Sequence, residues 1–339
     1  MKKFGVGVFG IGWVAKEHVR AYTYNPHVRV VSLASRKKES AQRCKDELGL
    51  DCEILPDFES LLKRNDIDII DICTPNSLHA QEAVAAALAG KQVVIEKPIA
   101  MNLEELKQVH QAIKKAGVKS QTGFVLRFNP YCRNLYEMLK AGAYGEPFYI
   151  ETDYYHEIGP WWSGYNWGSN TKKGGPSATL VAGCHAVDLL SWWGGEVEEV
   201  FAYGTFGHRT DYEYEPTYAA VVKFKNGKIG KTGNSFENEC PYFINVVIHG
   251  SNGSVLNEKF YTKKLFPYQS NWQTFNTIMP ESGDVKHHPF REMVDDFVDA
   301  LINDREPLAG IDASVRSHEL CLAIDLSIET GKPVKLPLL

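Results

Sequence analysis

The chain has 339 residues, of which 44% are hydrophobic and 23% are charged, and its formal net charge at pH 7 is −5. This length predicts two domains, and the composition is typical of an ordinary globular protein. Nucleic acid is not an expected partner, because binding to phosphates needs clustered lysine and arginine, and the chain has no basic run. Since no segment approaches the ~20 apolar residues of a membrane-spanning helix, we expect no membrane partner.

Seven cysteines are scattered along the chain, and none forms a CxxC pair. An odd number without paired spacing favours free thiols in a reducing compartment over disulfides or a four-cysteine zinc site. The N-terminal sequence MKKFGVGV superficially resembles a signal peptide, but its apolar stretch is short and rich in glycine, so a buried first strand explains it better. We therefore expect a cytoplasmic protein.

Strand and helix patterns alternate through residues 1–123. Short apolar runs predict strands, and the segments between them carry helix start and stop signals. Asn102 and Glu105, for example, have the spacing of a capping box. The expected strands are 4–9, 28–34, 67–73, 93–95 and 118–123, and the expected helices are 13–24, 37–48, 76–89 and 102–116. Repeated strand–helix units with apolar strands predict an α/β domain at 1–123, a dinucleotide-binding Rossmann domain with a doubly wound parallel sheet.

The pattern changes after residue 124. A predicted helix at 130–140 is followed by strand-like segments, and two of these are joined by Asn226-Gly227, a strong hairpin turn signal. The expected strands include 148–155, 218–224, 228–235 and 243–248, and the last expected helices are 290–303 and 313–330. Residues 124–339 are therefore predicted to form an α+β domain with a large, mostly antiparallel sheet, which would bind substrate and form subunit contacts.

A glycine motif follows the first predicted strand and opens the first predicted helix. Gly10 permits a tight turn, Gly12 lets the backbone approach a pyrophosphate, and Ala15 lets the helix pack close to the sheet. The first helical residue, Trp13, belongs to a helix N-terminus whose amide donors and positive dipole suit phosphates. This motif predicts dinucleotide binding, and the alternative is a mere glycine turn.

The second predicted strand ends at Ala34-Ser35-Arg36. A Rossmann domain specific for NAD usually has an acidic residue near this position to bind the ribose 2′-hydroxyl. Ser35 and Arg36 could instead hold a 2′-phosphate, since a guanidinium suits phosphate geometry. We expect NAD(P) as the cofactor, with NADP slightly favoured over NAD. The alternative is that Arg36 only begins a solvated helix.

Two further loops follow predicted parallel strands, at the carboxyl ends where open α/β sheets bind ligands. The first contains Thr74-Pro75-Asn76 and His79, and the second contains Glu96-Lys97-Pro98. Lys97 is therefore expected beside the nicotinamide, where oxidation of an alcohol requires removal of the hydroxyl proton. The alternative is a surface lysine that pairs with Glu96.

Together these motifs resemble those of the Gfo/Idh/MocA oxidoreductase family, and the resemblance covers essentially the whole chain in order. It runs through Gly10-x-Gly12-x-x-Ala15, Thr74-Pro75-Asn76-x-x-His79, Glu96-Lys97-Pro98, Gly123-Phe124-x-x-Arg127-Phe128-Asn129-Pro130, Gly174-Gly175, Gly183-x-His185-x-x-Asp188, Pro289-Phe290 and Thr330-Gly331-Lys332-Pro333-Val334. The family implies a Rossmann domain, a second domain with a large open sheet, and oxidation or reduction of sugars, inositols and related polyols. It also implies a homodimer or homotetramer, because the open sheet commonly packs between subunits.

The resemblance also implies roles for particular residues. Lys97 matches the usual proton carrier, and His185 matches the histidine that contacts the reacting hydroxyl or relays its proton. Asp188 matches the later acid of that motif, and Arg127 is assigned to the cofactor site. Val181 departs from the pattern, because many polyol-oxidising members have an aspartate there. The alternative for His185 is a buried structural imidazole.

An aromatic segment at 154–167 precedes the histidine motif and is interrupted by glycine and proline, which predicts a loop. Aromatic faces pack against the C–H faces of sugars. We therefore assign Tyr155, Trp161 and Trp162 to the substrate site, with core packing or a subunit contact as the alternative. The nearby Lys172 and Lys173 are expected to be solvated, although they could favour an acidic substrate. No metal site is predicted, since His287 and His288 lack ligand spacing to the acidic helix after them.

The leading functional hypothesis is reversible hydride transfer between a secondary hydroxyl of a sugar or polyol and the nicotinamide. A second hypothesis is glycoside cleavage through transient sugar oxidation by tightly held NAD. A third is a dinucleotide-binding sensor without chemistry, although the presence of Lys97 and His185 speaks against it.

Overall fold

The computed structural model describes residues 3–162, 164–171, 174–276 and 288–339. These residues form two compact units, one made of 3–125 with 288–315 and the other of 126–276 with 316–339. The first boundary lies close to the predicted division after residue 123. Residues 288–315, which the prediction places in the second domain, pack instead within the first unit.

The first unit is built on a six-stranded sheet in which all neighbouring strands are parallel, as predicted. The strand order is β3-β2-β1-β4-β5-β6, so the chain winds outward in both directions from β1. The strands are β1 (Phe4–Phe9), β2 (Val28–Ala34), β3 (Glu53–Leu55), β4 (Ile69–Ile72), β5 (Gln92–Ile95) and β6 (Ser120–Thr122). The helices between them are α1 (Trp13–Tyr24), α2 (Lys38–Glu47), α3 (Phe58–Leu62), α4 (Asn76–Leu88) and α5 (Leu103–Ala116).

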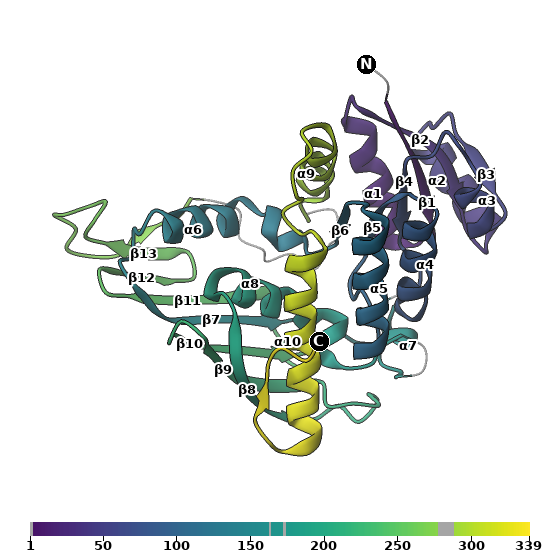
Figure 1. Ribbon diagram of the computed structural model, residues 1–339. Helices are drawn as coiled ribbons and strands as arrows, with labels where there is room; N and C mark the ends of the chain where they lie inside the picture. Colours follow the sequence, from purple (N-terminus) through teal and green to yellow (C-terminus); the bar gives the residue numbers. More distant parts are fainter. Residues whose placement is uncertain (1–2, 163, 172–173, 277–287) are drawn as a thin grey trace. The chain divides into compact units, whose positions relative to one another are not determined.

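The strand residues explain why this sheet is covered on both faces. β4 is buried at every position, and β2 is buried at all positions except Arg29. Because side chains alternate between the two faces of a strand, such a run needs helices on both sides. Helices α4 and α5 pack against each other, and α1 packs against α9 (Phe290–Ile302) (Figure 1). The short β3 and α3 were not predicted, because β3 has no buried position and α3 has only five residues.

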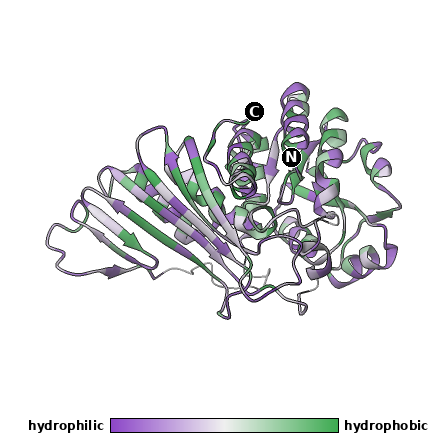
Figure 2. Cartoon of the chain, turned by 90° about the horizontal axis from the view of Figure 1, so that it is seen from below, coloured by the Kyte–Doolittle hydropathy of each residue, from purple (hydrophilic) through white to green (hydrophobic). Residues whose placement is uncertain are grey.

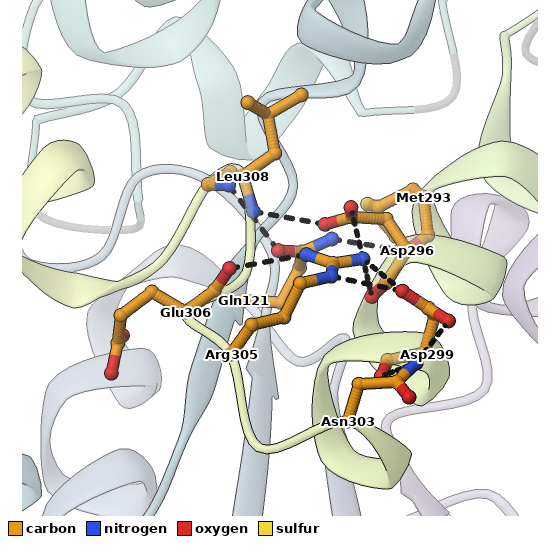
Figure 3. A network of polar contacts seen from close by, with 9 residues as sticks. Gln121, Met293, Asp296, Asp299, Asn303, Arg305, Glu306 and Leu308 are labelled. Atoms are coloured by element: carbon orange, nitrogen blue, oxygen red, sulfur yellow. Dashed lines mark hydrogen bonds and ion pairs between the residues drawn. The ribbon is translucent and has the colours of Figure 1, made fainter.

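Polar contacts hold α9 and the loop after it against the end of β6. The side-chain amide of Gln121 donates to the carbonyl oxygen of Met293 (3.0 Å). The backbone N–H of Thr122 donates to the carbonyl oxygen of Ala309 (2.9 Å). Figure 3 shows the network around Gln121, in which Arg305 forms ion pairs with the carboxylates of Asp296 and Asp299. These contacts explain why residues 288–315 join the first unit.

The second unit contains a nine-stranded sheet with the order β14-β13-β12-β11-β7-β10-β9-β8-β15. Its strands are antiparallel except for the pair β7 and β10, so the prediction of a mostly antiparallel sheet is confirmed. The strands are β7 (Pro147–Tyr155), β8 (Val197–Thr205), β9 (Thr217–Phe224), β10 (Ile229–Ser235), β11 (Phe243–Gly250), β12 (Gly253–Leu256), β13 (Lys259–Thr262), β14 (Gln273–Thr274) and β15 (Val334–Lys335). The predicted turn joins β9 to β10, where Gly227 has a φ of 86°.

The two faces of the nine-stranded sheet differ. Thr152 of β7 is buried and donates to the carbonyl oxygen of Ala186 in helix α8 (Cys184–Gly194), which packs on β7 and β10. The neighbouring Glu151 and Asp153 point to the other face, because successive strand residues alternate. Hydrophilic and hydrophobic positions accordingly alternate along the strands in Figure 2. Two further helices are α6 (Pro130–Lys140) and α10 (Ile311–Thr330).

Among the described residues, no helix has the length and apolar character needed to cross a bilayer.

The capping box predicted at the start of α5 is present and gives a direct test of the fold. The Asn102 side chain accepts from the backbone N–H of Glu105 (2.9 Å), and the Glu105 carboxylate accepts from that of Met101 (2.8 Å). Asn102→Ala should lower the free energy of unfolding by about 1 kcal/mol, because it removes this acceptor from the helix N-terminus. Denaturant unfolding measures the loss, and Asn102→Asp should restore most of it. Equal stability of the alanine variant and the wild type would contradict the assigned cap.

Candidate functional site

The predicted cofactor residues of the first unit gather at the carboxyl edge of its parallel sheet. Gly10 follows β1, Thr74 follows β4 and Glu96 follows β5, and these three strands are neighbours in the sheet. The backbone N–H of Cys73 still donates to Phe9 (2.8 Å), and that of Glu96 donates to Ile72 (3.0 Å). The edge is therefore the place where an open α/β sheet binds a ligand.

Glycine suits positions 10 and 12 for different structural reasons. Gly10 has a φ of 89°, and a β-carbon there would lie 2.7 Å from the backbone of Cys73 and Thr74. Glycine is required at this position by the fold itself. Gly12 has an ordinary φ of −99°, and nothing lies within 4 Å of the place where its β-carbon would be. The fold leaves open space at Gly12, which fits the close approach of a phosphate group.

The helix N-termini at this edge also suit a dinucleotide. No side chain caps α1 or α4, and neither helix has an acidic residue in its first turn. Of the other helices, α3, α5 and α6 are capped by side chains, whereas α2, α8 and α9 are not. A free helix N-terminus offers N–H donors and positive dipole to an anion. Ala15 is buried where α1 meets the sheet, and Trp13 at its start is about half exposed. These residues fit a nicotinamide dinucleotide.

The end of β2 presents the residues expected to recognise the adenosine part. Arg36 is exposed, and the Ser35 hydroxyl accepts from the backbone N–H of Lys37 (3.3 Å). A carboxyl group lies nearby: Glu82 of α4 accepts from the hydroxyl of Thr74 (2.5 Å). Burial raises the pKa of Glu82 to about 7, although the hydrogen bond from Thr74 and the charge of Arg36 oppose this rise. Glu82 was not predicted as part of the site.

His79 ties two loops of the edge together. Its ring is buried, with Nδ1 2.7 Å from the carbonyl oxygen of Pro98 and Nε2 2.8 Å from that of Thr74. Burial lowers its pKa. His79 therefore positions the backbone of both loops, and the neighbouring Asn76 is also buried at the start of α4. The structure brings these predicted residues together.

A buried histidine that the sequence analysis did not assign lies beneath this edge. His18 of α1 contacts Asp71 of β4 through Nδ1 (2.9 Å) and Glu96 through Nε2 (3.1 Å). Cys73 is close to both His18 and Asp71. Two signals could have revealed the cluster: Asp71 is a charge inside an apolar strand, and His18 follows Ala15 by one helical turn on the buried face.

Lys97 follows Glu96 directly, and its backbone N–H donates to the Glu96 carboxylate (3.3 Å). Lys97 is partly buried, and the three residues after it are buried, so it is not a fully solvated surface lysine. The loop therefore presents one amine at the carboxyl edge of β5.

In the second unit, His185 lies at the start of α8, directly after a π-helix at Thr179–Gly183 (η2). His185 is 6% exposed, and its ring stacks on that of Tyr154 with centroids 6.2 Å apart. The Tyr154 hydroxyl lies 3.1 Å from Nδ1 of His156. Single-turn π-helices are frequent at functional sites. Val181 is buried inside this π-helix.

Arg127 and Asp188 form a buried ion pair with each other. Nε and Nη2 of Arg127 lie 2.8 and 2.7 Å from the two carboxylate oxygens of Asp188, and the hydroxyl of Ser317 also donates to that carboxylate (2.7 Å). Arg127 is 3% exposed and Asp188 is 1% exposed. Arg127 and Asp188 thus pair with each other inside the second unit. Binding of the cofactor by Arg127 and of the substrate by Asp188 stays a prediction.

The aromatic segment divides between two environments. Tyr155 packs against Phe243 on the face of the sheet opposite to Tyr154, so Tyr154 is the one that neighbours His185. Trp161 is 60% exposed and contacts the ring of His156. Trp162 is partly buried. Lys172, Lys173 and His287 lie outside the described residues.

Comparison with known proteins agrees with this arrangement. Residues 4–124 match the family model for the Gfo/Idh/MocA "Oxidoreductase family, NAD-binding Rossmann fold", and residues 136–336 match the model for its C-terminal alpha/beta domain. The chain is 24% identical over 347 residues to scyllo-inositol 2-dehydrogenase (NAD(+)) of Bacillus subtilis, covering 97% of this chain and 95% of that protein. It is 25% identical over 340 residues to D-xylose 1-dehydrogenase (NADP(+)) 2 of Haloferax volcanii, covering 98% and 99%.

A solved structure of levoglucosan dehydrogenase in complex with NADH and levoglucosan has the same fold. The TM-score is 0.89 with 22% sequence identity, and the alignment covers 99% of this chain and 100% of that one.

The two motif glycines give a paired test of the dinucleotide site. Gly12→Ala should lower the free energy of unfolding by no more than about 1 kcal/mol, the cost of placing alanine at a helix N-cap, but it should weaken NADH binding at least about tenfold, because the new methyl group fills the open space. Gly10→Ala should instead destabilise the fold by more than about 2 kcal/mol, because φ and the backbone contact both forbid a side chain. Thermal unfolding and NADH fluorescence titration measure the two effects. Unchanged NADH binding by Gly12→Ala would contradict the site.

Proposed function

Because the chain belongs to the Gfo/Idh/MocA oxidoreductase family, we propose that it transfers a hydride between a secondary hydroxyl of a sugar or polyol and the nicotinamide of NAD(P). One observation carries this proposal: the carboxyl edge that leaves open space at Gly12 and two uncapped helix N-termini also presents Lys97. Relatives named as inositol and xylose dehydrogenases support a sugar or polyol as the substrate.

The residues of the edge have separate tasks in this proposal. The N-terminal amides of α1 hold the diphosphate, with Gly12 allowing its approach. The loops that His79 joins through Thr74 and Pro98 form a fixed frame for the rest of the cofactor. When bound, the nicotinamide accepts the hydride of the alcohol or returns it to the carbonyl product. We also assign to the cofactor site Trp13, Ala15, Ser35, Arg36, Pro75, Asn76, Glu96, Lys97 and Arg127.

Oxidation of an alcohol also releases a proton, and we assign its transfer to Lys97. The neutral amine takes the proton as the C–H bond breaks, and in the reverse direction the ammonium returns it to the developing alkoxide. The family resemblance assigns His185 to the orientation of the substrate hydroxyl. Val181 supplies no carboxylate at the position where many polyol-oxidising relatives have one, so His185 carries more of this task.

For the cofactor we infer a preference for NADP over NAD. Arg36 is an exposed cation at the end of β2, and Ser35 beside it supplies a hydroxyl, so this end of the sheet can accept a 2′-phosphate. Relatives with each cofactor are known, since one dehydrogenase is named for NAD and the other for NADP.

The substrate residues of the second unit are proposed with the same reasoning. Trp161 is 60% exposed beside His156 and offers an aromatic surface for the C–H face of a sugar. Trp162 is proposed for the same role, whereas Tyr155, predicted with them, lies on the face of the sheet opposite to Tyr154 and His185. Asp188 supports α8 through its pair with Arg127. The seven free cysteines support a cytoplasmic location.

We also propose that the protein is a homodimer or homotetramer that covers the face of the nine-stranded sheet opposite α8. Strand alternation places Tyr203, Val221 and Ile229 on this face, and they are 70%, 59% and 50% exposed. The same face holds Lys231, which pairs with the carboxylates of Glu151 and Asp153. An exposed apolar surface around an ion-paired polar centre suits contact with a second copy of the chain.

Substitution of Lys97 tests the proposed activity. The purified protein should reduce NADP or NAD with at least one member of a panel of sugars, inositols and sugar acids. Lys97→Met should lower kcat by at least about a hundredfold, because it removes proton transfer, while NADH binding should persist. Steady-state absorbance of the reduced cofactor measures turnover, and the faster cofactor tests the preference assigned to Ser35 and Arg36. Wild-type rates in Lys97→Met would contradict its role. If no substrate reduces the cofactor, cleavage of glycosides becomes the next assay.

A charge placed on the open sheet tests the assembly. Val221→Glu combined with Tyr203→Glu should shift the light-scattering mass to that of a single chain, because the new charges would be buried between copies. Leu88→Glu is the matched control, since Leu88 is 64% exposed at the end of α4 in the first unit. A wild-type protein that is already monomeric, or a double variant with unchanged mass, would contradict the proposal.

A further inference from the structure

His18 is a fully buried polar residue that the proposed reaction does not use. It lies on the inner face of α1, with 0% of its surface exposed. Its ring joins Asp71 of β4 to Glu96 in the loop after β5, at 2.9 and 3.1 Å. One side chain therefore connects three segments that form the carboxyl edge.

The groups around the ring decide its charge. The oxygens of Asp71 and Glu96 can only accept when they are ionised, so both ring nitrogens of His18 must donate to satisfy both contacts. From α9, the ring of Phe290 lies 4.8 Å from that of His18 and brings no charge. Tyr22 of α1 lies near Asp71.

The remaining neighbour is Cys73, whose sulfur lies 3.7 Å from Nδ1 of His18 and 3.4 Å from a carboxylate oxygen of Asp71. Burial raises the pKa of the Cys73 thiol, so it is neutral at physiological pH. Burial lowers the pKa of His18, but negative charge beside the ring raises that pKa well above its usual value. A neutral Cys73 supplies none of that charge, so the carboxylates of Asp71 and Glu96, at 2.9 and 3.1 Å from the ring, favour the cation.

Glu96 connects this cluster to Lys97. Its Oε1 faces His18, and its Oε2 accepts from the backbone N–H of Lys97 (3.3 Å). A β-carbon at Gly123 would lie 2.4 Å from Oε1 of Glu96, so the carboxylate is packed tightly against the next strand end. Burial raises the pKa of Glu96, but the hydrogen bond and charge of His18, with smaller effects of Lys97 and His79, bring it below its usual value.

We propose that His18 is a positioning residue: as a buried imidazolium bridging Asp71 and Glu96, it holds the Glu96 carboxylate in place and partly offsets its charge beside Lys97. This inference rests on the proposed role of Lys97 in proton transfer. With His18 charged, the three side chains carry a net charge of −1. Loss of the cation makes the cluster more negative and favours the ammonium form of Lys97, whereas loss of the Glu96 charge favours the neutral amine.

Opposite shifts in two variants test the proposal. In His18→Gln, the rising limb of the pH–rate profile for alcohol oxidation should move to higher pH by about one unit, and in Glu96→Gln it should move to lower pH by a similar amount. In the double variant His18→Gln/Glu96→Gln, the profile should return close to that of the wild type, because the opposite charge changes cancel and the cluster again carries a net charge of −1. This double variant also has no unpaired Glu96 carboxylate, so it keeps the test valid if His18→Gln does not fold.

A second readout does not depend on activity. Competitive acylation with acetic anhydride over a range of pH, followed by mass spectrometry of the peptide that contains Lys97, gives the midpoint pH of Lys97 labelling. The midpoints should move in the same directions as the rate profiles. His110→Gln is the matched control, because His110 of α5 also pairs with a carboxylate, Asp312, but does not contact Glu96; its midpoint should equal that of the wild type.

The two readouts separate the inference from the proposed function. Absence of any Lys97-dependent turnover would refute the function, while the labelling midpoints would still test His18. The inference is overturned if Glu96→Gln and His18→Gln shift the midpoint in the same direction, or if the midpoint of the double variant differs from that of the wild type by a full pH unit.

Discussion

The buried contact of His18 with Asp71 and Glu96 joins the first helix, the fourth strand and the loop after the fifth strand at the edge where the proposed chemistry takes place. The contribution of this contact to the stability of the fold is lost at both high and low pH. The pKa of His18 is raised, so its contribution is complete below the usual histidine pKa and is lost as pH rises through the raised value. The pKa of Glu96 is lowered, so its contribution is present above the usual carboxyl pKa and is lost as pH falls through the lowered value.

Buried carboxylates also fix the segment around His185 in the second unit. The π-helix before His185 begins at Thr179, whose hydroxyl contacts the Asp325 carboxylate, and Ser177 donates to that carboxylate at 2.6 Å. Burial raises the pKa of Asp325 to about 7, despite these hydrogen bonds. One turn beyond His185, Asp188 accepts from Arg127. In both units, therefore, buried carboxylates fix the short segment that presents the proposed reactive residue.

The sequence was sufficient to predict a parallel sheet followed by a mostly antiparallel one, because apolar strands, helix caps and the Asn226-Gly227 turn each have a local physical cause. It also predicted that Gly10, Thr74 and Glu96 lie at one sheet edge, since the carboxyl ends of parallel strands lie at the same edge. Other features have no local pattern: the π-helix carries no signature, and the choice of Tyr154 over Tyr155 beside His185 depends on which face the strand presents. Residues 288–315 join the first unit through contacts of Gln121 that are remote in sequence.

The charge of the His18 ring is the measurement that bears most directly on this account. Nitrogen NMR of the protein labelled with 15N in its histidine rings can follow each ring through a pH titration, and the variant with glutamine at both His18 and Glu96 identifies the His18 signals by their loss. The account predicts that both ring nitrogens of His18 stay protonated at pH 7, above the usual histidine pKa of about 6.5. A His18 ring with one bare nitrogen at pH 7 would contradict it.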